Sequence, residues 1–228
     1  MIRRLFTDIA GVYDRMNRIL SLGLDLRWRR KAAALVEDTP RRILDVACGT
    51  GDMAFALAYR FLSAEIVGVD LTPAMLELAR QKNRSPRIVF REGDVQALSS
   101  LESDGFDLAS CAFGFRNFTD KAAALAVVRQ SLKPGGRLLV LEFFRSGPAV
   151  LSFLTNLWLV LLANVFARRN AAAYAHLRES MRTTLSTQEF VALAESSGFV
   201  LSRRKVCFPC CTILLFQKDN VAKSGLKR

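Results

Sequence analysis

The chain has 228 residues, of which 51% are hydrophobic and 24% are charged. These values predict one globular domain with a full hydrophobic core, and they exclude a disordered or low-complexity protein. The net charge of +12 favours an acidic partner, either nucleic acid or an anionic membrane surface. The basic residues are spread out, with small clusters at 27–31, 168–169 and 203–205. Because no nucleic-acid-binding module is recognisable, we do not expect specific binding of nucleic acid.

Cysteine and histidine usage argues against a metal centre. Of the five cysteines, Cys207 and Cys210 form a single C-x-x-C pair with no second pair near it, and the only histidine is His176. A structural zinc site needs four such ligands. We therefore expect no metal. We also expect the free thiols of a cytosolic protein, since no cleavable signal peptide is recognisable.

Strands and helices alternate along most of the chain. The expected strands are 42–47, 65–70, 87–91, 106–112 and 137–143. Helices are expected at about 52–61, 72–82 and 120–132, with Thr72 as an N-cap before Pro73 and a turn at 133–136. This alternation predicts a Rossmann-like, doubly wound α/β fold with a mostly parallel sheet and helices on both faces.

The rhythm changes after residue 143. An inserted helical lid is expected at about 146–185, followed by a helix near 187–197 that begins at Ser186 or Thr187. Strands at 199–207 and 210–217 are separated by only two residues and should pair as a hairpin, which makes the last of seven strands antiparallel. We expect residues 1–218 to form a single domain and residues 219–228 to form a loose basic tail.

A glycine-rich turn follows the first strand and carries Gly49 and Gly51. Glycines let a ligand approach the backbone closely, and the helix that begins at Asp52 offers free N–H groups to an anion. Asp70 ends the second strand, where its carboxylate can hold ribose hydroxyls. This pattern fits an NAD-binding fold as well as a methyltransferase.

Three further features favour S-adenosylmethionine over NAD. Asp45 lies inside the first strand, where dinucleotide-binding folds usually keep an apolar residue. Gly93, Asp94 and Val95 follow the third strand, where an acid can reach an adenine amino group. Residues 133–138 (KPGGRL) lead into the fifth strand. In this order the segments resemble the motif series of the class I methyltransferases.

Motifs over about residues 5–200 resemble one family more narrowly, the quinone-ring C-methyltransferases that make menaquinone and ubiquinone precursors. Residues 6–17 (FTDIAGVYDRMN) are similar to its Y-D-x-M-N opening, and 47–52 (ACGTGD) to its A-G-G-T-G-D. Residues 113–120 (FGFRNFTD) are close to its F-G-x-R-N-x-x-D, the most specific match. The chain departs from the family at 183–185 and 208–212, which leaves open whether the substrate is a benzoquinol or a naphthoquinol.

The resemblance implies a set of residues that bind S-adenosylmethionine. Thr50 resembles the family's cofactor-binding threonine, and Asp70 resembles its ribose-binding acid. Asp94 and Val95 hold the place of the pair at the adenine. Ala112 stands where many relatives have serine, so it counts only as a lining position. The full expected set is Asp45, Gly49, Thr50, Gly51, Asp70, Leu71, Asp94, Val95 and Ala112.

Four residues are candidates for the chemistry: Tyr13, Asp14, Arg116 and Asn117. A reduced quinone ring becomes nucleophilic at carbon when a ring hydroxyl loses its proton, so the site needs a base or a cation. Arg116 could hold the phenolate and Asn117 could orient it, or Arg116 could brace its loop against Asp120 or Glu142. Tyr13 and Asp14 could close over the pocket, with Asp14 as a base, or Tyr13 could be a wall and Asp14 a helix cap.

His176 is a second candidate base. Relatives tend to carry tyrosine at this position, so a packing role on its helix is the alternative. Asp45 is expected to orient the glycine loop more than to touch the methyl donor.

Residues 146–167 contain no charged side chain and are rich in leucine and phenylalanine. We expect a lid that dips into the bilayer surface rather than a membrane span, with an ordinary core helix as the alternative.

The sequence therefore predicts a cytoplasmic enzyme, peripheral to the inner membrane, that methylates the ring carbon of a polyprenylated quinol. A homodimer or a quinone-synthesis complex is a further expectation. The rivals are a methyltransferase acting on another small molecule or on RNA, and a non-catalytic cofactor-binding subunit of such a complex.

Overall fold

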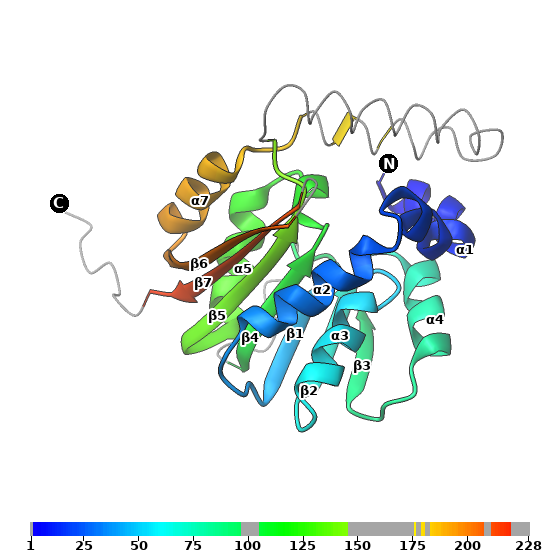
Figure 1. The fold of residues 1–228 in the computed structure, drawn as a ribbon, viewed down its shortest axis with the longest axis horizontal. Coiled ribbons are helices and arrows are strands. Elements are labelled where there is room, and N and C mark those ends of the chain that lie inside the picture. Colours follow the sequence, from blue (N-terminus) through cyan, green and yellow to red (C-terminus); the bar gives the residue numbers. More distant parts are fainter. Residues whose placement is uncertain are drawn as a thin grey trace.

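A seven-stranded sheet runs through the centre of the molecule in the order β3-β2-β1-β4-β5-β7-β6 (Figure 1). The computed structural model describes residues 2–96, 105–145, 176, 179–180, 183–207 and 211–219. The strands are β1 (Arg42–Val46), β2 (Glu65–Asp70), β3 (Ile88–Glu92), β4 (Phe106–Ala112), β5 (Leu132–Glu142), β6 (Phe199–Cys207) and β7 (Cys211–Lys218).

Strand direction follows the prediction. The first five strands pair in parallel, and β7 is inserted between β5 and β6, antiparallel to both. Leu44 in the middle of β1 lies opposite Val67 on one side and Ala109 on the other. Such a strand is apolar because both of its faces are covered. The doubly wound fold with an antiparallel last strand is confirmed.

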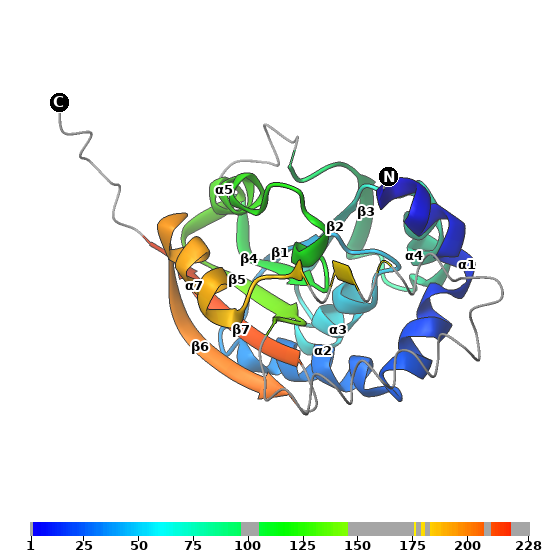
Figure 2. The same ribbon diagram turned by 90° about the horizontal axis from the view of Figure 1, so that it is seen from above.

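Helices cover both faces of the sheet (Figure 2). They are α1 (Ile2–Leu20), α2 (Leu24–Leu35), α3 (Asp52–Arg60), α4 (Pro73–Lys82), α5 (Lys121–Ser131) and α7 (Thr187–Ser196), with a short 3₁₀ turn η1 (Phe115–Asn117). Residues of α2, α3 and α4 share one buried apolar cluster with the sheet, and residues of α5 and α7 share a second cluster on the opposite face. The sheet is therefore buried on both sides, as the near-continuous apolar strands require.

Helix α1 lies outside these two layers. Its residues Ile9, Ala10 and Met16 pack with Met75 of α4 in a small apolar cluster of their own. Figure 1 shows α1 beside α4 at the end of the molecule opposite β6. This position brings one face of α1 to the ligand pocket described below.

One local expectation needs correction, and two predicted helix caps differ in their bonds. Residues 133–136 were expected as a turn before a strand, but they lie within the bounds of β5, and the register of β4 and β5 shifts there. Thr72 is the N-cap of α4, as predicted, although it makes no side-chain capping bond because its backbone N–H and hydroxyl serve Asp70 instead. Ser186, by contrast, forms a full capping box with Glu189.

The basic cluster at 27–31 is partly buried. Arg29 is only 5% exposed, and its guanidinium pairs with Asp25 at 3.1 Å and lies over the ring of Phe113. Burial of an arginine is tolerated only with such partners.

Most of the inserted segment 146–185 and the tail 220–228 lie outside the described residues, as does the apolar stretch 146–167. Across the described ranges, no helix is long and apolar enough to cross a membrane.

Candidate active site

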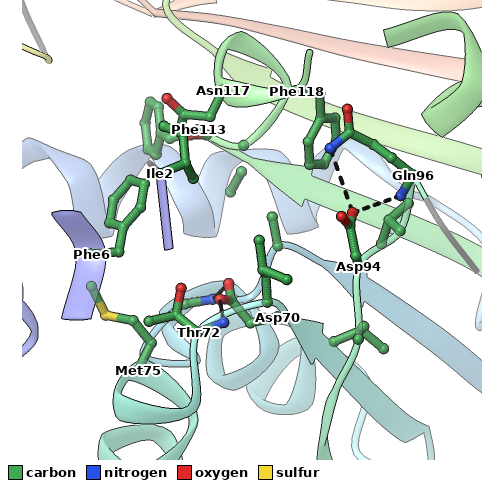
Figure 3. A pocket seen from close by; sticks show the side chains of 18 of the residues that line it. Ile2, Phe6, Asp70, Thr72, Met75, Asp94, Gln96, Phe113, Asn117 and Phe118 are labelled. Carbon is green, nitrogen blue, oxygen red and sulfur yellow. Dashed lines mark hydrogen bonds between the residues drawn. The ribbon is translucent and has the colours of Figure 1, made fainter. Parts of the chain in front are cut away.

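A pocket opens at the carboxyl ends of β1, β2, β3 and β4, with about 710 Å³ of empty space that includes open solvent. The strand order reverses between β1 and β4, and open α/β sheets bind ligands at such a switch point. In Figure 3, Asp70 and Thr72 lie on one side of the open space, with Asn117 and Phe118 on the opposite side. Eight of the expected site residues line this pocket: Tyr13, Gly49, Asp70, Leu71, Asp94, Val95, Ala112 and Asn117.

The glycine turn forms the floor of the pocket beside β1. Gly49 has φ +54° and Gly51 has φ +87°, a region that side chains disfavour. A Cβ on Gly51 would lie 2.8 Å from Cζ of Phe90, whereas a Cβ on Gly49 would meet nothing within 4 Å. Gly51 is therefore required by packing, and Gly49 leaves its backbone open to a ligand.

Asp70 is held rigidly at the end of β2. Its Oδ2 accepts from the backbone N–H of Gly49 at 2.8 Å, and its Oδ1 accepts from that of Thr72 at 2.8 Å. Burial raises the pKa of this carboxyl, and the amide hydrogen bonds oppose the rise. Asp70 lines the pocket, where its carboxylate oxygens can accept from hydroxyl groups of a ligand.

A second acid lies beyond β3. Asp94 lines the pocket, and its Oδ1 accepts from the backbone N–H of Gln96 at 2.9 Å (Figure 3). The neighbouring Val95 is 4% exposed and belongs to the core under α5. Asp94 therefore faces the pocket from a fixed turn, with its second oxygen available to an amino group.

Asp45 is placed below the pocket. It is fully buried, and its Oδ1 accepts from the hydroxyl of Ser110 at 2.6 Å. Burial raises its pKa to about 7. Its Oδ2 has no hydrogen-bond partner among the described residues. Asp45 does not line the pocket, although it is one of the residues predicted to bind the cofactor.

Asp14 is not a helix cap, because it lies inside α1. Its Oδ1 accepts from the hydroxyl of Thr50 at 2.5 Å, and its Oδ2 accepts from Lys82 at 2.7 Å. Lys82 also contacts Asp52 at 3.0 Å. Asp14 and Thr50 both lie beside the pocket and fasten α1 to the glycine turn.

Arg116 forms an ion pair with Glu142 and not with Asp120, the other partner that the sequence allowed. The distance from Nη1 to Oε1 is 2.6 Å, and the two side chains are 8% and 1% exposed. The guanidinium also lies over the rings of Phe113 and Phe143. Arg116 does not line the pocket in this arrangement, so its charge lies one layer behind the wall.

Asn117 reaches the pocket from η1. Its Nδ2 donates to the backbone carbonyl of Phe113 at 3.5 Å, and its Oδ1 lies 3.2 Å from Nε2 of His176. Tyr13 enters the same pocket from α1, with its ring edge against Phe6. The predicted ring-binding residues therefore converge, apart from Arg116 and Asp14.

Several lining residues were not expected from the sequence. Ile2 and Phe6 share a face of α1 with Tyr13, and this helical spacing was a readable signal. Phe113 and Phe118 belong to the motif at 113–120, but the sequence assigned them no role. Gln96 gave no signal, because its position depends on the turn after β3. No group of three or more metal-ligating side chains gathers within the described ranges.

Comparison with known proteins matches residues 1–211 to the ubiE/COQ5 methyltransferase family. The demethylmenaquinone methyltransferase of Deinococcus radiodurans is 40% identical over 213 residues, which cover 91% of this chain and 88% of that protein. The corresponding protein of Thermus thermophilus is 39% identical and covers 92% and 97%. The ubiquinone/menaquinone biosynthesis C-methyltransferase UbiE of Geobacter sulfurreducens is 39% identical and covers 87% and 80%.

Solved structures agree on the fold. A methyltransferase of Haloferax volcanii in complex with its activator Trm112 superposes with a TM-score of 0.70 at 17% identity, covering 97% of this chain and 99% of that one. Human N-acetylserotonin methyltransferase in complex with S-adenosylmethionine gives 0.65 at 20% identity, covering 96% and 60%. At such identities the likeness shows the fold alone.

Proposed function

Because the chain belongs to the ubiE/COQ5 methyltransferase family, we propose that it methylates a ring carbon of a polyprenylated quinol, with S-adenosylmethionine as the donor. The main support for this proposal is that one pocket contains both a polar end and an aromatic end. Gly49, Asp70 and Asp94 form a polar end suited to a nucleoside. Tyr13 and Asn117 form an aromatic and amide end suited to a phenol.

The residues present fit this cofactor. When bound, S-adenosylmethionine supplies a methyl group already activated on a sulfonium. The open space above Gly49 lets the backbone approach it, and Asp70 lines the pocket where its carboxylate can accept from the ribose hydroxyls. Asp94 can accept from the adenine amino group, and Leu71 and Ala112 provide apolar wall. Thr50, Gly51 and Asp45 support the turn without lining the pocket.

Asp70→Ala tests the cofactor assignment. Loss of a charged hydrogen-bond acceptor costs roughly 1.5–3 kcal/mol, so affinity for S-adenosylmethionine should fall about 10-fold to 100-fold by calorimetry. Glu77→Gln, on the exposed face of α4, is the matched control. Unchanged affinity in Asp70→Ala would contradict the assignment.

The chain's own residues would mainly align the ring carbon and exclude water. Asn117 would orient the ring oxygen, and Tyr13 with Phe113 and Phe118 would hold the ring plane. Arg116 would act from behind Phe113: with Glu142 it fixes the turn that carries Asn117, and its charge favours a phenolate nearby.

Product analysis separates the candidate substrates. Methyl-labelled S-adenosylmethionine is incubated with the protein and with demethylmenaquinol, 2-methoxy-6-polyprenyl-benzoquinol or RNA. We expect label in an organic-soluble quinol and none in RNA. Binding of the donor without transfer to either quinol would instead support the non-catalytic subunit, which family membership disfavours. Cells lacking the protein should accumulate a quinone precursor lighter by one methylene.

A long prenyl tail requires the enzyme to work at a bilayer. We propose that residues 1–218 form one domain, cytoplasmic and peripheral to the inner membrane. Support comes from the net charge of +12 and from the exposed basic residues Arg203, Arg204 and Lys205 on β6. Vesicles with anionic lipid should capture the protein in a flotation assay, and capture should weaken as salt rises. Equal capture by neutral vesicles would contradict this attachment.

A further inference from the structure

His176 lies beside the pocket and contacts a residue that lines it. Its Nε2 is 3.2 Å from Oδ1 of Asn117, whose amide reaches the ring end of the pocket. It is the only histidine of the chain, and histidine is the side chain whose ordinary pKa lies nearest neutrality. We propose that His176 is the general base that takes the proton of the ring hydroxyl, an inference that rests on the proposed function.

The hydrogen bonds of Asn117 indicate which imidazole nitrogen carries the proton and which can accept one. Its Nδ2 donates to the carbonyl of Phe113, which directs Oδ1 toward the imidazole. A carbonyl oxygen only accepts, so Nε2 of His176 must carry the proton and Nδ1 must hold the lone pair. The tautomer is thus assigned from the two bonds of one amide. After Nδ1 takes a proton, Nε2 can keep its bond to Asn117.

The charges around His176 keep the imidazole ready to accept a proton. Burial, and then the positive charge of Arg116, lower its pKa below the ordinary 6.5. Glu142 partly balances Arg116, while Lys121 and Tyr13 are further titratable groups that face this pair. The imidazole is therefore neutral at pH 7. The same Arg116 charge favours a phenolate in the pocket and so lowers the pKa of the ring hydroxyl. The pKa values of the proton donor and of the acceptor His176 are therefore lowered together.

Three described carboxylates near the pocket already accept hydrogen bonds from protein groups. Asp14 accepts from Thr50 and Lys82, and Asp70 accepts from two backbone amides. Glu142 is 1% exposed and bonded to Arg116. Asp94 is assigned to the adenine amino group, so among the described residues we take His176, which contacts Asn117, as the base.

Methyl transfer begins at the ring hydroxyl. The ring O–H bond breaks, its proton goes to Nδ1 of His176, and the electron pair stays on oxygen as a phenolate. The ring carbon then forms the C–CH₃ bond while the S–CH₃ bond of the sulfonium breaks, with that electron pair left on sulfur. The methylated carbon loses its hydrogen to water as a proton, and the imidazolium returns its proton to the oxygen. One proton is released to solvent for each methyl transferred.

Nuclear magnetic resonance of the imidazole tests the base without requiring turnover. Protein labelled with ¹⁵N at histidine carries one imidazole, so its two nitrogen signals need no assignment by mutation. We expect a protonated Nε2, an unprotonated Nδ1 at pH 7.5 and a titration midpoint below 6.5. Arg116→Gln should raise that midpoint, because it removes the neighbouring positive charge. A protonated Nδ1, or a midpoint above 6.5, would overturn the assignment.

Kinetics then test the role. In the wild type, kcat should fall on the acid side with the midpoint found for the imidazole. His176→Gln should lower kcat about 100-fold or more and abolish this acid limb, with unchanged affinity for S-adenosylmethionine. Thr183→Ala, at an exposed position farther along the chain, is the control. An active wild type whose His176→Gln variant keeps kcat and its acid limb would overturn the base alone. A wild type that transfers methyl to no quinol would overturn the proposed function as well.

Discussion

The carboxylate of Glu142 accepts hydrogen bonds from both the guanidinium and the backbone N–H of Arg116, at 2.6 and 3.2 Å. One side chain at the end of β5 thereby fixes both the position of η1 and the charge behind the pocket wall. The two groups are almost fully buried, so neither can be satisfied by water if the other is removed.

Arg116→Met should therefore destabilise the fold as well as lower turnover. It leaves the Glu142 carboxylate buried without its partner, at a cost of about 3–5 kcal/mol in the free energy of unfolding. The double variant Arg116→Met/Glu142→Leu should recover most of this loss and still transfer methyl groups poorly. Urea unfolding measures the first effect and kcat the second. A double variant no more stable than Arg116→Met would contradict the pairing.

Gly49 and Gly51 should respond differently to alanine. Both have positive φ, which costs an alanine roughly 1–2 kcal/mol. Gly51→Ala adds a clash with Phe90 and should lose about 1–3 kcal/mol more. Gly49→Ala places its methyl in open space that the cofactor would fill, so it should reduce cofactor affinity with the smaller loss of stability. Thermal unfolding and calorimetry together decide; equal stability of the two variants would refute the clash.

The fold and the nucleoside end of the site were readable from the sequence, because they depend on short-range spacing. A strand, a glycine turn and a helix, with an acid ending the next strand, already place Gly49 and Asp70. The contacts of Asp14 were not readable. They join residues 36 and 68 positions apart, between α1 and the glycine turn and between α1 and α4, and no local pattern specifies this packing.

The partner of Arg116 illustrates the same limit. Sequence reasoning left Asp120 and Glu142 as alternatives. The choice depends on the register of β4 and β5, in which Ala112 lies opposite Leu141, so that the turn after β4 meets Glu142. Asp120 instead caps α5 by accepting from the N–H of Ala123.

Asp45 should make stability depend on pH. Its carboxyl titrates near 3.8 when unfolded and at about 7 when folded, so the native state binds the extra proton between these values. The free energy of unfolding should therefore lose a few kcal/mol from this group as pH rises from about 4 to 7. In Asp45→Asn this contribution is absent, so the variant should gain stability relative to wild type across that range. Urea titrations at several pH values measure the difference, and a difference independent of pH would contradict the buried proton.

Lys82 should control the attachment of α1. It bridges Asp14 of α1 and Asp52 of α3, at 2.7 and 3.0 Å, and is partly exposed. In Lys82→Met, the amides of α1 should exchange hydrogen about 5-fold faster, because a partly exposed pair contributes up to about 1 kcal/mol. Arg84→Met removes a positive charge just beyond the same helix and is the control. Equal exchange in both variants would show that the Lys82 bridge does not hold α1.

The position of β7 bears on how the chain is made. It is the most C-terminal of the described strands, yet it fills an interior place between β5 and β6. During synthesis, β5 must therefore present an unpaired apolar edge until residues 211–218 leave the ribosome, a state prone to aggregation. A product terminated before residue 211 should accordingly be a chaperone client and a substrate for proteolysis rather than a smaller working enzyme.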